Sequence, residues 1–184
     1  MALLPFVDES QASDKTREIL GNTPRKLNVA RMIANASDAV FQNFSRLGNS
    51  LMTRGKLNGK LREIAILRNA RVCNSLYEYT QHVPIAKSAG VSEQQIAAID
   101  HWEGATCFTD LERLVLRFTD EIARNVKGER STLAALQKHL GSGEIVELIM
   151  AVGFWGMVAR LLETTEVELE EFAGKVNLLE RGKQ

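Results

Sequence analysis

Apolar residues recur at spacings of three and four along most of the chain, and this period limits what the chain can fold into. The spacing places apolar side chains on one face of an α-helix, and the abundance of Leu, Ala, Glu, Arg and Ile favours the same conformation. Only three of the 184 residues are proline, and no segment has a credible strand pattern. The sequence therefore predicts an all-α fold.

The predicted helices span residues 14–20, 26–34, 37–54, 58–73, 75–89, 92–100, 109–125, 131–140 and 143–164. Glycines suited to a left-handed helix C-terminus follow three of them: Gly21, Gly90 and Gly141. Hydroxyl residues suited to N-capping stand at four helix starts: Ser37, Ser92, Thr109 and Ser131. The segment 101–109 is the most plausible internal loop, and we expect both halves to share one core in a single domain over residues 1–184.

Composition narrows the function classes. The 23 basic and 23 acidic residues balance, and no long run has one sign, so we expect binding to neither nucleic acid nor an anionic membrane. The most apolar stretch, residues 148–159, is shorter than the roughly 20 residues of a membrane helix, which predicts a buried helix. Cys73 and Cys107 are far apart and form no CxxC pattern, and the N-terminus lacks a secretory leader. We expect a cytoplasmic protein that acts on a small molecule.

Glu63 lies on the apolar face of the predicted helix 58–73, because Ile66, Leu67 and Ala70 follow it at helical spacing. Burial disfavours the charged form of a carboxylate and can prepare it for proton transfer. The alternative is that Glu63 forms an ion pair with a neighbouring arginine of the same helix: Arg62, Arg68 or Arg71.

The next predicted helix carries four reactive side chains along one stripe, namely Ser75, Glu78, Tyr79 and His82. Histidine exchanges protons near neutral pH, and a neighbouring carboxylate can orient it. The short connection between the two helices should make them neighbours and bring Glu63 toward His82. We therefore predict His82, Glu63 and Glu78 as catalytic residues.

Ser75 and Glu78 also match the capping box S-x-x-E, in which each side chain satisfies a backbone donor of the other residue. The same pattern recurs at Ser92 with Gln95 and at Thr109 with Glu112. For the serine and the glutamate, capping is thus the simpler explanation.

A metal site built from Glu63, Glu78 and His82 is conceivable, but His101 and His139 have no ligand spacing to them. No phosphate loop, dinucleotide fingerprint or zinc pattern occurs. We expect neither a metal nor a cofactor.

Residues 61–99, "LREIAILRNARVCNSLYEYTQHVPIAKSAGVSEQQIAAI", resemble the carboxymuconolactone decarboxylase family, which includes the alkylhydroperoxidase D (AhpD) proteins. The similarity continues more loosely upstream over residues 27–57 and downstream over residues 144–162. It places a family core at about residues 40–125, followed by the helix 143–164. The resemblance implies a helical bundle, homo-oligomers and a substrate site around His82.

The peroxidase branch of this family places a glutamate, two cysteines of a CxxC pair and a histidine where this chain has Glu63, Ser75, Glu78 and His82. The spacing is kept, but neither thiol of that pair is present, and thiolate chemistry needs them. The resemblance then implies cofactor-free acid–base chemistry, of a decarboxylase, lyase or isomerase type, on a small organic acid or lactone. In that setting Ser75 would hold a substrate oxyanion or carboxylate at the helix N-terminus, beside Tyr77 and Tyr79.

Two other functions remain open: peroxide reduction, as in the wider family and with Cys73 in a shifted geometry, and ligand binding by a catalytically silent oligomer. The sequence does not identify a substrate. Trp155 and its neighbours Phe154 and Met157 are expected in the core or at a subunit interface rather than in a ligand site.

Overall fold

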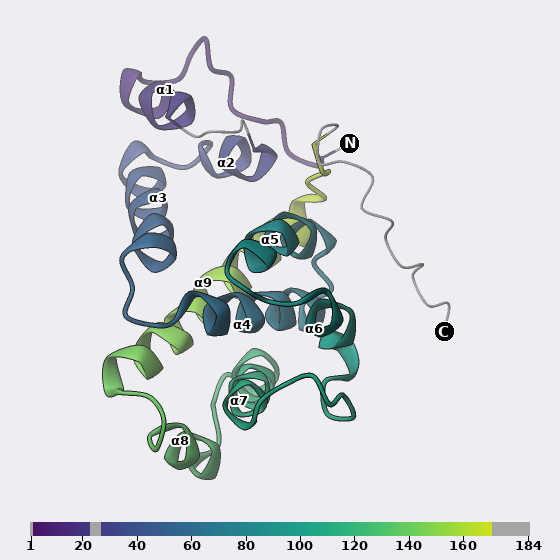
Figure 1. The fold of residues 1–184 in the computed structure, drawn as a ribbon. Coiled ribbons are helices and arrows are strands. Elements are labelled where there is room, and N and C mark those ends of the chain that lie inside the picture. Colours follow the sequence, from purple (N-terminus) through teal and green to yellow (C-terminus); the bar gives the residue numbers. More distant parts are fainter. Residues whose placement is uncertain (1, 23–26, 171–184) are drawn as a thin grey trace.

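The computed structural model describes residues 2–22 and 27–170, and every regular element in these residues is helical (Figure 1). The elements are α1 (Asp14–Gly21), α2 (Asn28–Ile33), α3 (Asp38–Thr53), α4 (Gly59–Val72), α5 (Leu76–Ser88), α6 (Glu93–Ala98), the 3-10 turn η1 (Ile99–His101), α7 (Asp110–Asn125), α8 (Arg130–Leu136) and α9 (Ser142–Thr165). All the predicted helices are thus confirmed, although the predicted start of the second one, Lys26, lies outside the described residues.

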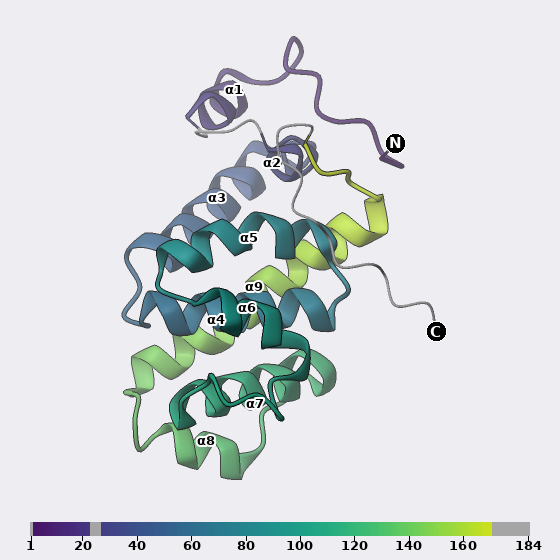
Figure 2. The same cartoon turned by 45° about the vertical axis from the view of Figure 1, so that its right-hand side comes forward.

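Helix α4 lies at the centre of the fold, with α5 on one side and α7 on the other, while α9 crosses behind it (Figures 1 and 2). All ten residues from Leu61 to Ala70 are buried, so α4 contacts protein on every side. Its charged residues must therefore find partners inside the fold. Arg68, for example, makes two hydrogen bonds to Asp120 of α7, at 2.6 and 2.9 Å.

Helix α9 is 24 residues long, about twice the length of the apolar stretch at residues 148–159. By length and composition it could span a membrane, but it packs against α3, α4, α5 and α7. More than half of its most apolar segment is buried within the protein. Its apolar character therefore belongs to the core, as predicted.

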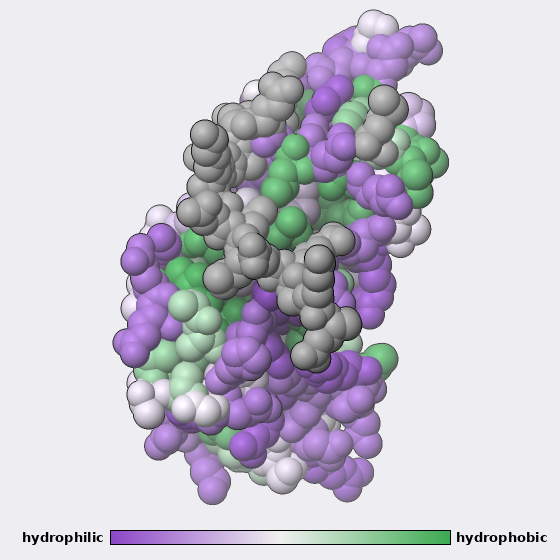
Figure 3. Space-filling model, turned by 90° about the vertical axis from the view of Figure 1, so that its right-hand side faces the viewer, coloured by the Kyte–Doolittle hydropathy of each residue, from purple (hydrophilic) through white to green (hydrophobic). Residues whose placement is uncertain are grey.

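One face of the molecule shows how the surface is composed. Hydrophilic side chains cover much of the lower part of this face, and hydrophobic ones occur in groups between them (Figure 3). Apolar side chains are therefore found on the surface of the protein as well as in its core.

Three of the four predicted N-caps are confirmed, because the hydroxyls of Ser37, Ser92 and Thr109 each accept a hydrogen bond from the first turn of their helix. The prediction of Ser131 as the fourth N-cap is wrong, because α8 begins at Arg130 and its N-cap is Glu129. The Glu121 carboxylate accepts hydrogen bonds from the backbone N–H of Glu129 at 2.8 Å and from the Thr132 hydroxyl at 2.7 Å. This tertiary contact sets the start of α8.

Only one of the three glycines predicted at helix C-termini has a left-handed conformation, namely Gly90 with φ of 91°. Gly21 is the last residue of α1, without a positive φ. Gly141 has φ of −72° and is the N-cap of α9, where its N–H donates to the Glu144 carboxylate at 2.8 Å. The prediction is wrong there because Gly141 begins the next helix rather than ending the previous one.

The end of the described chain returns to the N-terminal helices and holds them against α5. The buried Glu170 carboxylate accepts hydrogen bonds from the Tyr77 hydroxyl, from Gln81 Nε2 at 2.6 Å and from the Asn28 backbone N–H at 2.6 Å. The Tyr77 hydroxyl in turn accepts a hydrogen bond from the Val29 N–H at 3.1 Å. Glu170 thus connects α2, the C-terminal segment and two side chains of α5.

We expect Glu170→Ala to destabilise the protein by roughly 2–4 kcal/mol, since it leaves the buried Tyr77 hydroxyl and two partly buried donors without an acceptor. Urea denaturation measures this loss, and limited proteolysis should cleave first near α1 and α2. Glu163→Ala is the control, because Glu163 is exposed on α9. Equal stability of the two variants would show that Glu170 does not hold these helices in place.

Candidate functional site

Glu63 of α4 and His82 of α5 meet inside the protein. Asn74, in a left-handed conformation with φ of 53°, reverses the chain between the two helices and makes them neighbours. Glu63 Oε2 lies 2.9 Å from His82 Nδ1, which confirms the proximity predicted from the sequence. Because Glu63 is fully buried, this contact is protected from water.

The ion pair considered as an alternative for Glu63 is also present. Arg62 Nε donates to Glu63 Oε1 at 3.0 Å, so each carboxylate oxygen has its own partner. With a carboxylate at Nδ1, the imidazole carries its proton on that nitrogen and turns Nε2 toward the other side. Glu63 therefore sets the tautomer and the orientation of His82.

A second carboxylate, Glu78, lies on the other side of the imidazole. Glu78 Oε2 is 3.8 Å from His82 Nε2 and has no hydrogen-bond partner among the described residues. Glu78 is only 4% exposed, and this burial raises the pKa of its carboxyl from 4.5 to about 7, although the nearby His82 acts in the opposite direction. A carboxyl with such a pKa can both take up and release a proton near neutral pH.

The capping-box interpretation of Ser75 and Glu78 is wrong. Boxes form at the two other matching sites, but the Ser75 hydroxyl caps no backbone N–H. The Ser75 N–H, which Glu78 would need, donates instead to the Ala70 carbonyl at 2.8 Å in the tight turn between the helices. Glu78 is thereby left without its local partner.

Glu78 and His82 line a cavity of about 1070 Å³ between α5 and α9 on one side and the N-terminal helices on the other. Its lining is mainly apolar and includes aromatic side chains from two helices: Phe41, Phe44, Phe154 and Trp155. Trp155 packs edge-on against the His82 ring, with 5.4 Å between the ring centroids. Trp155 and Phe154 thus belong to the core, as predicted, but against the prediction they also line the cavity.

The three residues predicted to bind substrate have different positions. Tyr77 lines the cavity, and burial together with Glu170 raises the pKa of its hydroxyl well above the usual value. Ser75 is only 1% exposed and is not among the residues that line the cavity. Tyr79 does not line it either, because its hydroxyl donates to the Ile96 carbonyl at 3.2 Å.

The predicted stripe on α5 therefore divides. The cavity runs along one edge of the stripe, where Glu78, Gln81 and His82 lie, while Ser75 and Tyr79 lie along the other edge and pack inside the protein. A helix presents several such edges, and only the arrangement of its neighbours decides which of them borders a cavity.

Cys73 lies outside this cavity. Its side chain lines a smaller cavity of about 420 Å³ together with Arg160 and Glu163. Burial raises the pKa of the Cys73 thiol, which disfavours the reactive thiolate. Among the described residues no cluster of three His, Cys, Asp or Glu side chains could hold a metal ion.

Sequence patterns indicated no role for Gln81 or Glu170, whereas Arg62 was one of three arginines considered as partners of Glu63. Gln81 precedes His82 directly, so its position in the sequence offered a weak signal. Glu170 is 89 residues from Gln81, and nothing in the local sequence indicates their contact.

The carboxymuconolactone decarboxylase family model matches residues 38–121, which contain Glu63, Glu78 and His82. A comparison with curated proteins gave no significant match. Among solved structures, the AhpD-core peroxidase-related protein from Ralstonia eutropha JMP134 has a TM-score of 0.80 at 17% identity, covering 94% of both chains.

Two further structures have the same fold. The putative antioxidant defence protein AhpD from Agrobacterium tumefaciens is 22% identical with a TM-score of 0.67, covering 74% of this chain and 94% of its own. A debrominase in complex with 2,3,4-tribromopyrrole is 13% identical with a TM-score of 0.75, covering 93% of both chains. The family match and this shared fold lead to one conclusion: residues 38–121 match the carboxymuconolactone decarboxylase family, and the chain has the AhpD-like helical fold.

Proposed function

We propose that the protein is an acid–base enzyme of the lyase or isomerase type that moves a proton on an organic acid or lactone without a cofactor. The observation that carries the proposal is the pair formed by Glu78 and His82 at the buried side of the cavity. Glu78 Oε2 has no hydrogen-bond partner among the described residues, and His82 Nε2 lies 3.8 Å away. Both groups can thus reach neighbouring atoms of one substrate.

The two groups have complementary tasks. The Glu78 carboxylate removes a proton from a carbon next to a carbonyl group, and the electron pair of that C–H bond moves into the carbonyl to form an enolate. Protonated His82 then donates its Nε2 proton to the enolate oxygen. Glu63 is a positioning residue, since it contacts Nδ1 and does not line the cavity.

The two alternatives have less support. Peroxide reduction needs a reactive thiolate, whereas the positions of the family's cysteine pair hold Ser75 and Glu78, and burial raises the pKa of Cys73. A silent binding protein would gain nothing from an unpartnered buried carboxyl, because burial of such a group costs free energy.

Proton abstraction can be tested before the natural substrate is known. A panel of lactones, 1,3-dicarbonyl compounds and 3-oxo acids is incubated with the protein in D₂O, and NMR follows the loss of C–H signals. We expect Glu78→Gln and His82→Gln to slow this exchange by about a hundredfold to ten-thousandfold.

Cys73→Ser is the control and should exchange as the wild type does. Unchanged exchange in both site variants would contradict the proposed reaction. Peroxide turnover that disappears in Cys73→Ser would favour the peroxidase alternative instead.

The pKa of Glu78 also predicts how stability depends on pH. The folded protein holds the Glu78 proton up to a pKa of about 7, whereas the unfolded chain releases it near 4.5. Stability from this group is therefore fully present below the lower value and is lost as pH rises through the higher one. Between about pH 5 and pH 8, the wild type should lose up to about 3 kcal/mol relative to Glu78→Gln.

Urea denaturation of both proteins at several pH values measures this difference. Glu163→Gln, a change at an exposed carboxyl, should follow the wild type. Parallel pH profiles of the wild type and Glu78→Gln would show that the pKa of Glu78 is the same in the folded and the unfolded protein.

We also propose that the protein forms a homo-oligomer through α9. Several apolar side chains of this helix are 41–53% exposed: Val146, Ile149, Met150 and Met157. Several large apolar side chains exposed on one helix favour association with another protein surface.

Light scattering at micromolar concentration should give a mass above that of one protomer. The double variant Ile149→Lys with Met157→Lys should have the mass of a single protomer. Val40→Lys changes an equally exposed apolar residue of α3 and should leave the oligomer intact. A monomeric wild type would contradict this proposal.

A further inference from the structure

The cavity is larger than a small organic acid or lactone requires. Its volume of about 1070 Å³ lies slightly above the roughly 300–1,000 Å³ found for sites that hold drug-sized ligands. Apolar side chains from α2, α3, α5 and α9 form most of the lining, among them Val29, Met52, Ile85 and Val158. Most of a ligand that fills this space must therefore be apolar.

The buried side of the cavity is unsuited to an anion. The ionisable groups there are Glu78 and His82, which are 4% and 7% exposed. Arg62 is the nearby cation, but it pairs with Glu63 and does not line the cavity. Arg62 and protonated His82 already balance the charges of Glu63 and Glu78. A substrate carboxylate beside Glu78 would therefore be an additional buried negative charge without its own cation, and burial makes that arrangement costly.

The outer rim has the opposite character. Gln42, Arg46 and Asn49 lie at helical spacing on the face of α3 that lines the cavity, and Arg46 and Asn49 are exposed. No hydrogen bond or ion pair joins Arg46 to any described residue, so its guanidinium is available to an anion. The other described cation of the lining, Lys15, already pairs with Glu18 at 2.9 Å.

We infer that the substrate is an amphipathic carboxylate: its carboxylate binds Arg46 at the rim, and its long apolar body lies between the aromatic walls. The uncharged carbonyl group of that body then reaches the Glu78–His82 pair. This inference rests on the proposed function for the position of the reacting group. The sequence led us to expect a small acid, and the size and polarity of the cavity favour a much larger, mostly apolar one.

Binding can be measured without turnover. Isothermal titration calorimetry with butanoate, hexanoate, octanoate and decanoate should show affinity rising by roughly twofold to fourfold per added methylene, as burial of each CH₂ predicts. Octanoate should bind about twofold to fivefold tighter than octanamide, its uncharged counterpart, because Arg46 is exposed to solvent. Ala30→Trp and Ser45→Trp fill the cavity from two helices, α2 and α3, and should each weaken decanoate binding at least about tenfold.

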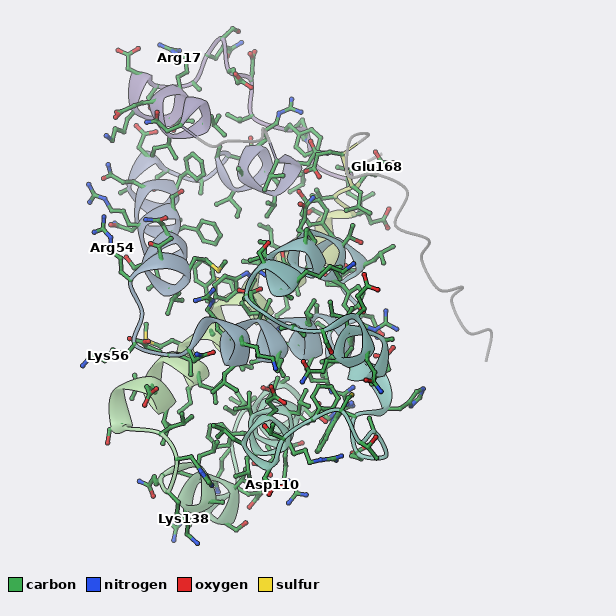
Figure 4. The ribbon with its side chains drawn as sticks, viewed as in Figure 1. Arg17, Arg54, Lys56, Asp110, Lys138 and Glu168 are labelled. Carbon is green, nitrogen blue, oxygen red and sulfur yellow. The ribbon has the colours of Figure 1, made fainter. Side chains whose placement is uncertain are left out.

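Arg46→Gln should remove the preference for octanoate over octanamide and keep the dependence on chain length. Arg54→Gln is the matched control, because Arg54 lies at the end of α3 with its side chain directed away from the protein and does not line the cavity (Figure 4). The inference fails if affinity does not rise with chain length, if both tryptophan variants bind decanoate as the wild type does, or if Arg46→Gln keeps the preference.

His82→Gln separates this inference from the proposed reaction. This variant should keep the rise of affinity with chain length and the preference for octanoate over octanamide, since these two trends depend on the apolar lining and on Arg46. If the series binds as described while deuterium exchange is unchanged in His82→Gln, the substrate class stands and the proposed reaction is wrong. If exchange is lost in His82→Gln but chain length has no effect, the reaction stands and the substrate class is wrong.

Discussion

The fold is organised around a fully buried carboxylate. Glu63 has no contact with water, and its two oxygens are held by Arg62 and by His82. A charge in this position is tolerated only while both partners remain, because an unpaired buried charge costs several kcal/mol. Its partners come from α4 and α5. The packing of these two helices and the orientation of the imidazole therefore depend on each other.

Helix α4 must be enclosed for this arrangement to exist. Helices α5, α7 and α9 surround it, and its arginines extend to acidic partners on neighbouring elements, such as Asp120 on α7 and Asp100 in η1. The core thus consists of packed apolar side chains, with ion pairs at its periphery. Such a rigid scaffold holds His82 in place while the cavity side of α5 stays open to a ligand.

The cavity depends on parts of the chain outside that scaffold. Helices α2 and α3 supply one wall, and Glu170 attaches α2 to Tyr77 and Gln81. The same hydrogen bonds occupy the polar groups of Tyr77 and Gln81, so the unpartnered carboxyl that remains on this face of α5 is Glu78. Enclosure also changes the acidity of this carboxyl, because burial raises the pKa of Glu78 to about 7.

The sequence by itself determined the helices and the contact between Glu63 and His82. Helical periodicity is a local property and can be read from the sequence. A connection as short as Cys73 to Ser75 keeps the two helices that it joins next to each other. Only the structure decided that Glu78 forms no capping box, because the Ser75 N–H donates to the Ala70 carbonyl in the turn between the helices. The tertiary structure alone decided which edge of α5 borders the cavity and that Glu170 fixes α2 to α5. These last two features depend on contacts between residues far apart in the chain, which a local pattern cannot encode.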